Sequence, residues 1–169
     1  AIAYYRKADL DNAIQLVDGL ILEHPNDPYF HELKGQILFE TGRLKEALPY
    51  YKKAVDLSPE THLLNRALGR VLVEINDQNL LKRAIYFLSK AVNIDKNDPF
   101  SWRLLGSAWG KAGDKGKSSL AFAEASLLIG KTTDALFHAK RASSLLKKNS
   151  AGWIQAQDIL LAIRNKKKK

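Results

Sequence analysis

The residues that come nearest to a catalytic motif are His31 and Glu32, which open the segment HELKG. A His-Glu-x-x-His helix binds zinc because its two histidines lie one turn apart on one face, with the glutamate as general base. Here the fifth residue is Gly35, so the second zinc ligand is missing. We therefore interpret His31 as a packed or half-buried histidine, and we expect no metal site at this position.

The other chemistry-bearing residues form no recognisable active site. His24, His62 and His138 have no histidine or carboxylate four residues further on. The sequence holds no cysteine, which excludes disulfides and thiolate metal ligands. The glycine-rich run 110–116 is typical of a turn between two helices rather than of a phosphate-binding loop. We expect this chain to have no catalytic residue, no metal and no cofactor, and so to be no enzyme.

The charge of the chain is strongly basic but unevenly placed. The net charge is +9, yet residues 1–130 carry 17 basic and 16 acidic side chains, whereas residues 131–169 carry 10 and 2. Lys166–Lys169 supply half of the C-terminal excess, and a basic run at a chain end is usually a solvated tail. Duplex binding needs a basic surface that follows the phosphates, so a nucleic-acid partner is disfavoured. No apolar run is long enough to span a membrane, and no signal peptide opens the chain.

The unit that must position any functional residue is the segment 27–59, which predicts two helices joined by a tight turn. Asp27 is a good N-cap, and Pro28 stands at the first helical position, where its missing N–H costs nothing. Apolar residues recur at helical spacing until Thr41-Gly42, and a second amphipathic run then extends from Leu44 to Leu57.

This unit recurs along the chain. Gly35 and Gly69 are 34 residues apart, Gly69 and Gly106 are 37 apart, and the period then returns to 34. The longer step indicates a three-residue insertion, which we place in the turn near residues 77–79. Because a helix–turn–helix period of 34 residues is that of the tetratricopeptide repeat (TPR), the chain resembles this family. The expected fold class is all-α, a right-handed TPR superhelix (α-solenoid) of about ten helices with a C-terminal capping helix.

We predict a single TPR domain over residues 1–165. It comprises a partial first repeat at 1–26, repeats at about 28–61, 62–98 and 99–130, a degenerate repeat at 131–149 and a capping helix at 151–165, followed by a basic tail at 166–169. The helix that ends at about residue 129 should pack on both sides. In the capping helix, Trp153, Ala156, Leu160 and Ile163 share one stripe, and we expect Trp153 to be buried.

The first helix of each pair lines the concave surface in a stack of this kind, which predicts a partner-binding groove. Its solvent-facing positions are Tyr29, Glu32, Gln36, Phe39, Leu63, Arg66, Arg70, Phe100 and Arg103, with Val73 and Ser107 beside them. Three arginines beside aromatic and aliphatic side chains favour an extended peptide with a carboxylate, or an acidic face of a protein. The alternative is that Glu32, Glu40 and Glu74 neutralise these arginines across adjacent helices, and the sequence leaves both open.

A narrower resemblance rests on the segments 27–42, 97–106, 120–131 and 151–159. Together they resemble the C-terminal TPR region of bacterial M48-family zinc metallopeptidases. The resemblance implies a periplasmic parent protein in outer-membrane protein quality control, whose zinc and HExxH motif belong to an N-terminal domain outside this chain. It implies that the present chain holds protein partners or substrates, including the parent's own protease domain and outer-membrane proteins. The chain also begins inside a helical pattern, so we expect it to be part of a longer protein.

Two function classes therefore remain for a non-catalytic interaction module. The first is the partner-binding TPR domain of a periplasmic M48-like metalloendopeptidase. The second is a stand-alone TPR adaptor, in the cytoplasm, which binds a partner's peptide in its concave groove. The residues upstream of Ala1 distinguish these two, through the presence or absence of a signal peptide and HExxH.

Overall fold

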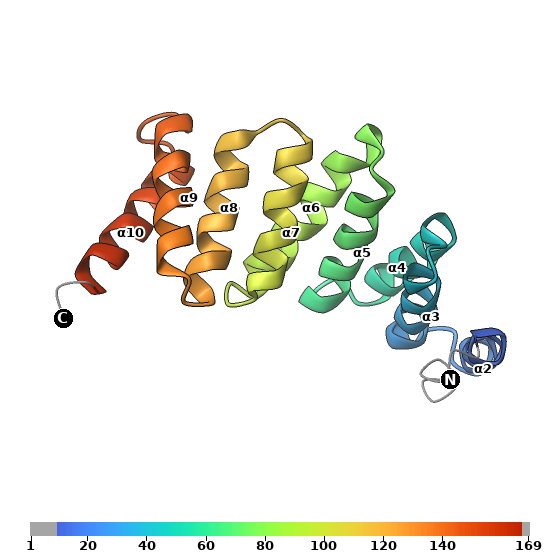
Figure 1. Cartoon of the computed structure of the whole chain (residues 1–169). Helices are drawn as coiled ribbons and strands as arrows, with labels where there is room; N and C mark the ends of the chain where they lie inside the picture. Colours follow the sequence, from blue (N-terminus) through green and yellow to red (C-terminus); the bar gives the residue numbers. More distant parts are fainter. Residues whose placement is uncertain (1–9, 167–169) are drawn as a thin grey trace.

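The computed structural model describes residues 10–166, and within this range all regular structure is helical. The helices are α2 (Leu10–Glu23), α3 (Pro28–Glu40), α4 (Leu44–Leu57), α5 (His62–Ile75), α6 (Gln78–Ile94), α7 (Pro99–Lys111), α8 (Lys115–Leu128), α9 (Thr132–Leu145) and α10 (Ala151–Lys166). Successive helices pack against each other, and the stack extends from α2 at one end to α10 at the other (Figure 1). The fold is the expected all-α solenoid. Residues 1–9 of the predicted partial first repeat and residues 167–169 of the predicted basic tail lie outside the described residues.

The start and end of each helix pair follow from local capping. The Asp27 carboxylate accepts a hydrogen bond from the backbone N–H of Tyr29 (2.8 Å), with Pro28 in the first turn. Asp98 caps α7 in the same way through the N–H of Phe100 (3.0 Å). Between α3 and α4 the chain turns at Gly42, whose φ of 78° lies in the left-handed region.

The three additional residues of the longer period lie near residues 77–79, as predicted, but they extend the first turn of α6 rather than the turn that precedes it, so their expected conformation was wrong. Asp77 accepts a hydrogen bond from the N–H of Asn79 (2.8 Å) and thereby starts α6 at Gln78. Helix α6 has 17 residues, whereas its counterpart α4 has 14. The turn stays short because Asn76 adopts a left-handed φ of 57°, which asparagine tolerates well.

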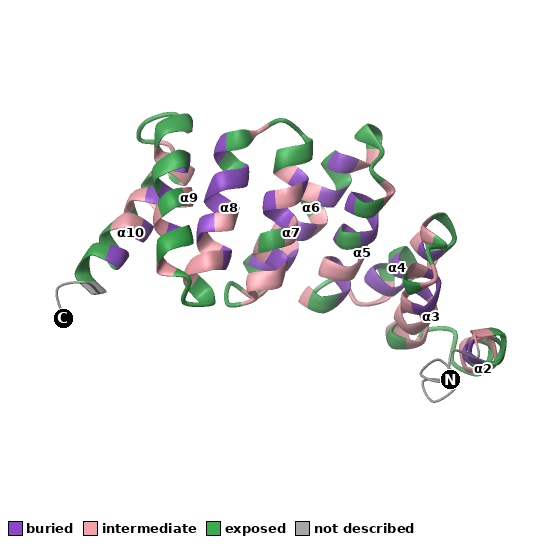
Figure 2. Ribbon diagram, viewed as in Figure 1, coloured by how far each residue is buried: buried purple, intermediate pink, exposed green. Residues whose placement is uncertain are grey.

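In the pairs α3–α4, α5–α6 and α7–α8, a glycine of the first helix lies against a large side chain of the second. A Cβ atom at Gly69 would lie 2.5 Å from Cγ of Leu88, and one at Gly35 or Gly106 would lie 3.1 Å from the ring of Tyr51 or Phe122. The large side chain of the second helix therefore occupies the space that a larger residue on the first would need. The buried face of each helix points into the layer between its neighbours (Figure 2).

The C-terminal part has its own core, in which α8 packs between α7 and α9 as predicted. The alanines 135, 139 and 142 of α9 let α10 approach closely, and Ala156, Ile159 and Ile163 of α10 are buried there. Trp153 is only half-buried, so its predicted burial was wrong. In the first turn of α10 it is Gly152 that comes near Leu120 and Leu146, and the indole stays at the edge of the stack. Among the helices of residues 10–166, none combines the length and apolar character that crossing a bilayer requires.

Candidate partner-binding groove

The first helices of the pairs are α3, α5 and α7, and α5 contacts both α3 and α7 as well as its own partner α6. This arrangement places them together on one layer of the stack, and we call its open face the groove. A hollow of about 230 Å³ lies between them. It is lined by Tyr29, Glu32, Gln36, Tyr51, Leu63, Leu64, Arg66, Ala67, Arg70 and Phe100. Seven of the nine predicted groove residues are in this set, and the other two, Phe39 and Arg103, adjoin it through ring contacts.

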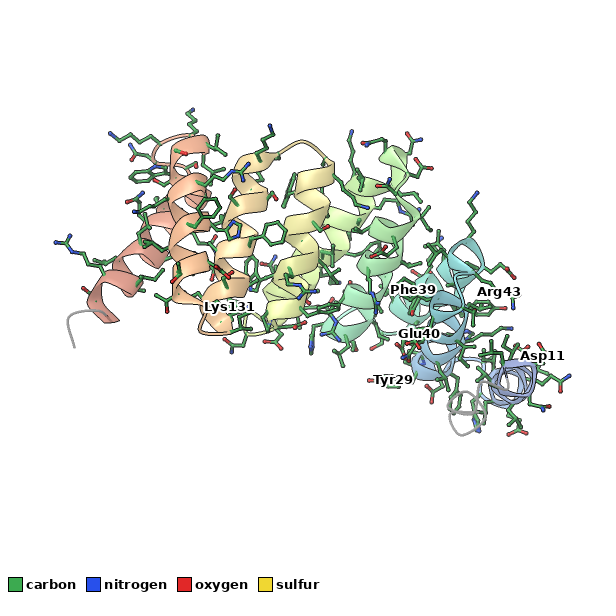
Figure 3. All side chains as sticks on the ribbon, in the orientation of Figure 1. Asp11, Tyr29, Phe39, Glu40, Arg43 and Lys131 are labelled. Atoms are coloured by element: carbon green, nitrogen blue, oxygen red, sulfur yellow. The ribbon has the colours of Figure 1, made fainter. Side chains whose placement is uncertain are left out.

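The arginine side chains of the groove form cation–π contacts with phenylalanine rings. The guanidinium carbon of Arg70 lies 4.3 Å from the ring centroid of Phe39 and 5.8 Å from that of Phe100. The guanidinium carbons of Arg66 and Arg103 lie 5.3 and 5.6 Å from the same Phe100 ring. Such contacts stabilise a cation over the negative face of the ring without neutralising it. Figure 3 shows Phe39 and Tyr29 on α3, from which the groove begins.

Arg66 is less available than predicted, because it forms an ion pair. Its Nη1 donates to Oδ2 of Asp98 over 2.7 Å, and the hydroxyl of Ser101 donates to the same oxygen over 2.6 Å. Burial by itself would raise the pKa of Asp98, but the hydrogen bonds from Ser101 and Arg66 outweigh it, and the pKa is lowered. Arg66 therefore ties α5 to the start of α7.

Asp98 is the functional residue that sequence reasoning missed in this ion pair. The predicted counter-ions were Glu32, Glu40 and Glu74, and Asp98 was not among them. Its two oxygens separate these roles, since Oδ1 accepts from the Phe100 N–H and Oδ2 accepts from Arg66. No local sequence signal indicates this second role, because Arg66 and Asp98 belong to different repeats.

Glu32 and Arg70 at the first hollow, and Arg103 beside it, have no ion pair among the residues that the structure describes. Burial raises the pKa of Glu32, and the positive charge of Arg66 offsets part of this effect. Glu40 accepts a hydrogen bond from Gln36 over 2.9 Å instead of pairing with an arginine. The predicted neutralisation across adjacent helices is thus not observed for Arg70 or Arg103.

Two further predicted positions are placed differently. Val73 is 2 % exposed and belongs to the core, so its assignment beside the groove was wrong. Ser107 lies in a second hollow of about 410 Å³, further along the stack. This hollow is lined by Glu74, Arg103, Leu104, Ser107, Phe122, Ala125, Ser126, Ile129, Lys131 and Asp134. Because Arg103 lines it and also contacts Phe100, the two hollows adjoin. The α8 residues were missed because only first helices were assigned to the groove.

His31, the residue of the incomplete zinc motif, is a packing residue. Its side chain is buried, and its Nε2 lies 2.8 Å from the carbonyl oxygen of Pro25, to which it donates. This outcome matches its interpretation as a packed histidine. In the part of the chain from residue 10 to residue 166, no three histidine, aspartate or glutamate side chains gather as a metal site.

Comparison with known proteins identifies the fold. The family model of the tetratricopeptide repeat matches residues 1–61. MamA from Desulfovibrio magneticus RS-1 superposes with a TM-score of 0.71 at 18 % identity, over 98 % of this chain and 90 % of that chain. YrrB, described as a TPR protein with an unusual peptide-binding site, gives 0.69 at 21 % identity, over 96 % and 82 %. TTC0263, a thermophilic TPR protein of Thermus thermophilus, gives 0.57 at 18 % identity, over 95 % of each chain.

No curated protein sequence matches the chain. The similar structures share its fold at low identity, and together with the matched repeat model they show a TPR solenoid. The predicted fold class, an all-α TPR-type solenoid, is thereby confirmed.

Proposed function

We propose that the chain binds an extended peptide segment of a partner protein in the groove formed by α3, α5 and α7. One observation carries the proposal: the guanidinium groups of Arg70 and Arg103 stack on phenylalanine rings beside a hollow, yet neither has a carboxylate partner among the described residues. Stacking holds a guanidinium in place before a ligand arrives, so less conformational entropy is lost on binding. A carboxylate of the partner would complete these sites.

The walls of the groove suit a peptide rather than a nucleic acid. Tyr29 is 57 % exposed and Leu63 is 45 % exposed, so apolar surface accompanies the charges. The two adjoining hollows continue from α3 to α9, which favours an extended ligand over a compact one. The near balance of charge in residues 1–130 offers no basic track for phosphates. The similar structure of YrrB, described as a TPR protein with an unusual peptide-binding site, supports this class of ligand on the same fold.

A displayed library of random 12-residue peptides, selected on the full chain, tests this function. The double variant Arg70→Ala with Arg103→Ala should bind selected peptides at least about tenfold more weakly, and the loss should be larger at low salt. The matched control is Arg83→Ala with Arg164→Ala, which removes two exposed arginines outside the groove. Equal binding by both double variants, or no enriched peptide at all, would contradict the proposal.

We further propose that the groove belongs to a periplasmic, M48-like zinc metalloendopeptidase that acts on outer-membrane proteins. The support is the resemblance of the segments 27–42, 97–106, 120–131 and 151–159 to the C-terminal TPR region of that family. In this setting, the partners are outer-membrane protein segments and the parent's own protease domain. The upstream coding sequence decides: a signal peptide and an HExxH motif support this parent, whereas their absence favours the stand-alone TPR adaptor.

A further inference from the structure

Glu32 is the only acidic residue among the described residues that line the first hollow. It is partly buried, and burial raises its pKa. No hydrogen-bond donor from residues 10–166 reaches its carboxylate. Because the Glu32 carboxylate is partly withdrawn from water and accepts no hydrogen bond from these residues, it is incompletely solvated in the free protein. A ligand that donates a hydrogen bond to it would remove this penalty.

None of the neighbouring side chains in the described part of the chain donates a hydrogen bond to Glu32. Arg66 donates to Asp98 over 2.7 Å, and Arg70 lies over the ring of Phe39 at 4.3 Å. Gln36, one turn further along α3, directs its amide to Glu40 over 2.9 Å. Among the described residues that line the first hollow or stack on the Phe100 ring, one negative charge without an ion pair thus lies on α3, at Glu32, and two such positive charges lie on α5 and α7, at Arg70 and Arg103.

We infer that Glu32 is a specificity-determining residue that accepts hydrogen bonds from a lysine or arginine side chain of the bound peptide. This inference rests on the proposed function of the groove. The charges of the partner peptide then follow the order of the helices α3, α5 and α7. Its basic residue lies at α3, and its carboxylate lies at Arg70 and Arg103 of α5 and α7. Both ends of such a peptide meet an opposite charge, which fixes its direction in the groove.

The test uses peptides selected from the displayed library on the full chain, then synthesised with and without their basic residue. Replacing that lysine or arginine by alanine should weaken binding to the unaltered chain roughly tenfold or more. The same replacement should have little effect on binding to the Glu32→Gln variant, because the two changes remove one interaction. Asp56→Asn, a carboxylate-to-amide change at an exposed position of α4, is the matched control and should retain the full effect.

A second selection makes the inference independent of any one peptide. The Glu32→Lys variant should enrich peptides with aspartate or glutamate where the unaltered chain enriches lysine or arginine. Selected peptides that depend on Arg70 and Arg103 but carry no basic residue coupled to Glu32 would overturn this inference and leave the proposed function standing. Peptides that are indifferent to all three residues would overturn both.

Discussion

The side chain of Asp98 both caps its own helix and links that helix to a neighbouring one. One carboxylate oxygen caps α7, and the other pairs with Arg66 of α5, 32 residues earlier in the chain. Asp27 occupies the same position before α3 but only caps its helix. A comparison of substitutions at the two aspartates therefore separates the contribution of the helix cap to stability from that of the ion pair.

At this scale we predict that Asp98→Asn lowers the free energy of unfolding by about 1–2 kcal/mol, because asparagine preserves the cap but loses the charged pair. The lowered pKa of Asp98 stabilises the fold above its ordinary pKa, and this stabilisation is lost as the pH falls through the lower folded value. Urea midpoints from about pH 5 to pH 2 should therefore fall less steeply in the variant. Asp27→Asn is the control, and an equal loss in both variants would refute the role of the pair.

At the scale of the element, the first and second helices of each pair meet at a glycine. Gly69 is the tightest case, because Cγ and Cδ2 of the fully buried Leu88 would lie 2.5 and 2.7 Å from a new Cβ atom. In α2, by contrast, a Cβ atom at Gly19 would meet no atom of residues 10–166 within 4 Å. The periodic glycines of the sequence are therefore contact points between helices rather than breaks in them.

We predict opposite effects of alanine at these two glycines. Gly69→Ala should lower the free energy of unfolding by about 1–3 kcal/mol, since α5 and α6 must separate or Leu88 must leave its rotamer. Gly19→Ala should raise it by about 0.5–1 kcal/mol through helix propensity alone. Denaturant unfolding followed by circular dichroism measures both. A stabilised Gly69→Ala protein would show that the α5–α6 contact is looser than described.

The elements also show what the sequence could and could not predict. The start of α3 and of α7 was predictable to the residue, because Asp-Pro combines a cap with a fixed φ. The wrong assignments of Val73 and Trp153 concern which way a helix face points, and this depends on how neighbouring helices cross. The Arg66–Asp98 pair joins two repeats, so no local pattern could reveal it. The cluster of Arg70, Arg103 and Phe100 was predictable in outline, because it follows from the repeat period.

At the scale of the whole molecule, the TPR stack brings the first helices of successive pairs onto one face. That face gathers unpaired charges of both signs and exposed apolar side chains over two adjoining hollows. The second helices α4 and α6 contribute mainly core residues to the same stack, through Ala47, Tyr51, Ala84 and Leu88. The central claim of this account is that partner binding belongs to the face of α3, α5 and α7.

The most direct test is the NMR spectrum of the full chain during titration with a library-selected peptide. The account predicts amide chemical-shift changes concentrated on α3, α5 and α7 and on the adjoining part of α8, with a scrambled peptide of equal composition as control. Changes concentrated on α4, α6 or the outer side of α10 would contradict it and would place the partner on the opposite face of the solenoid.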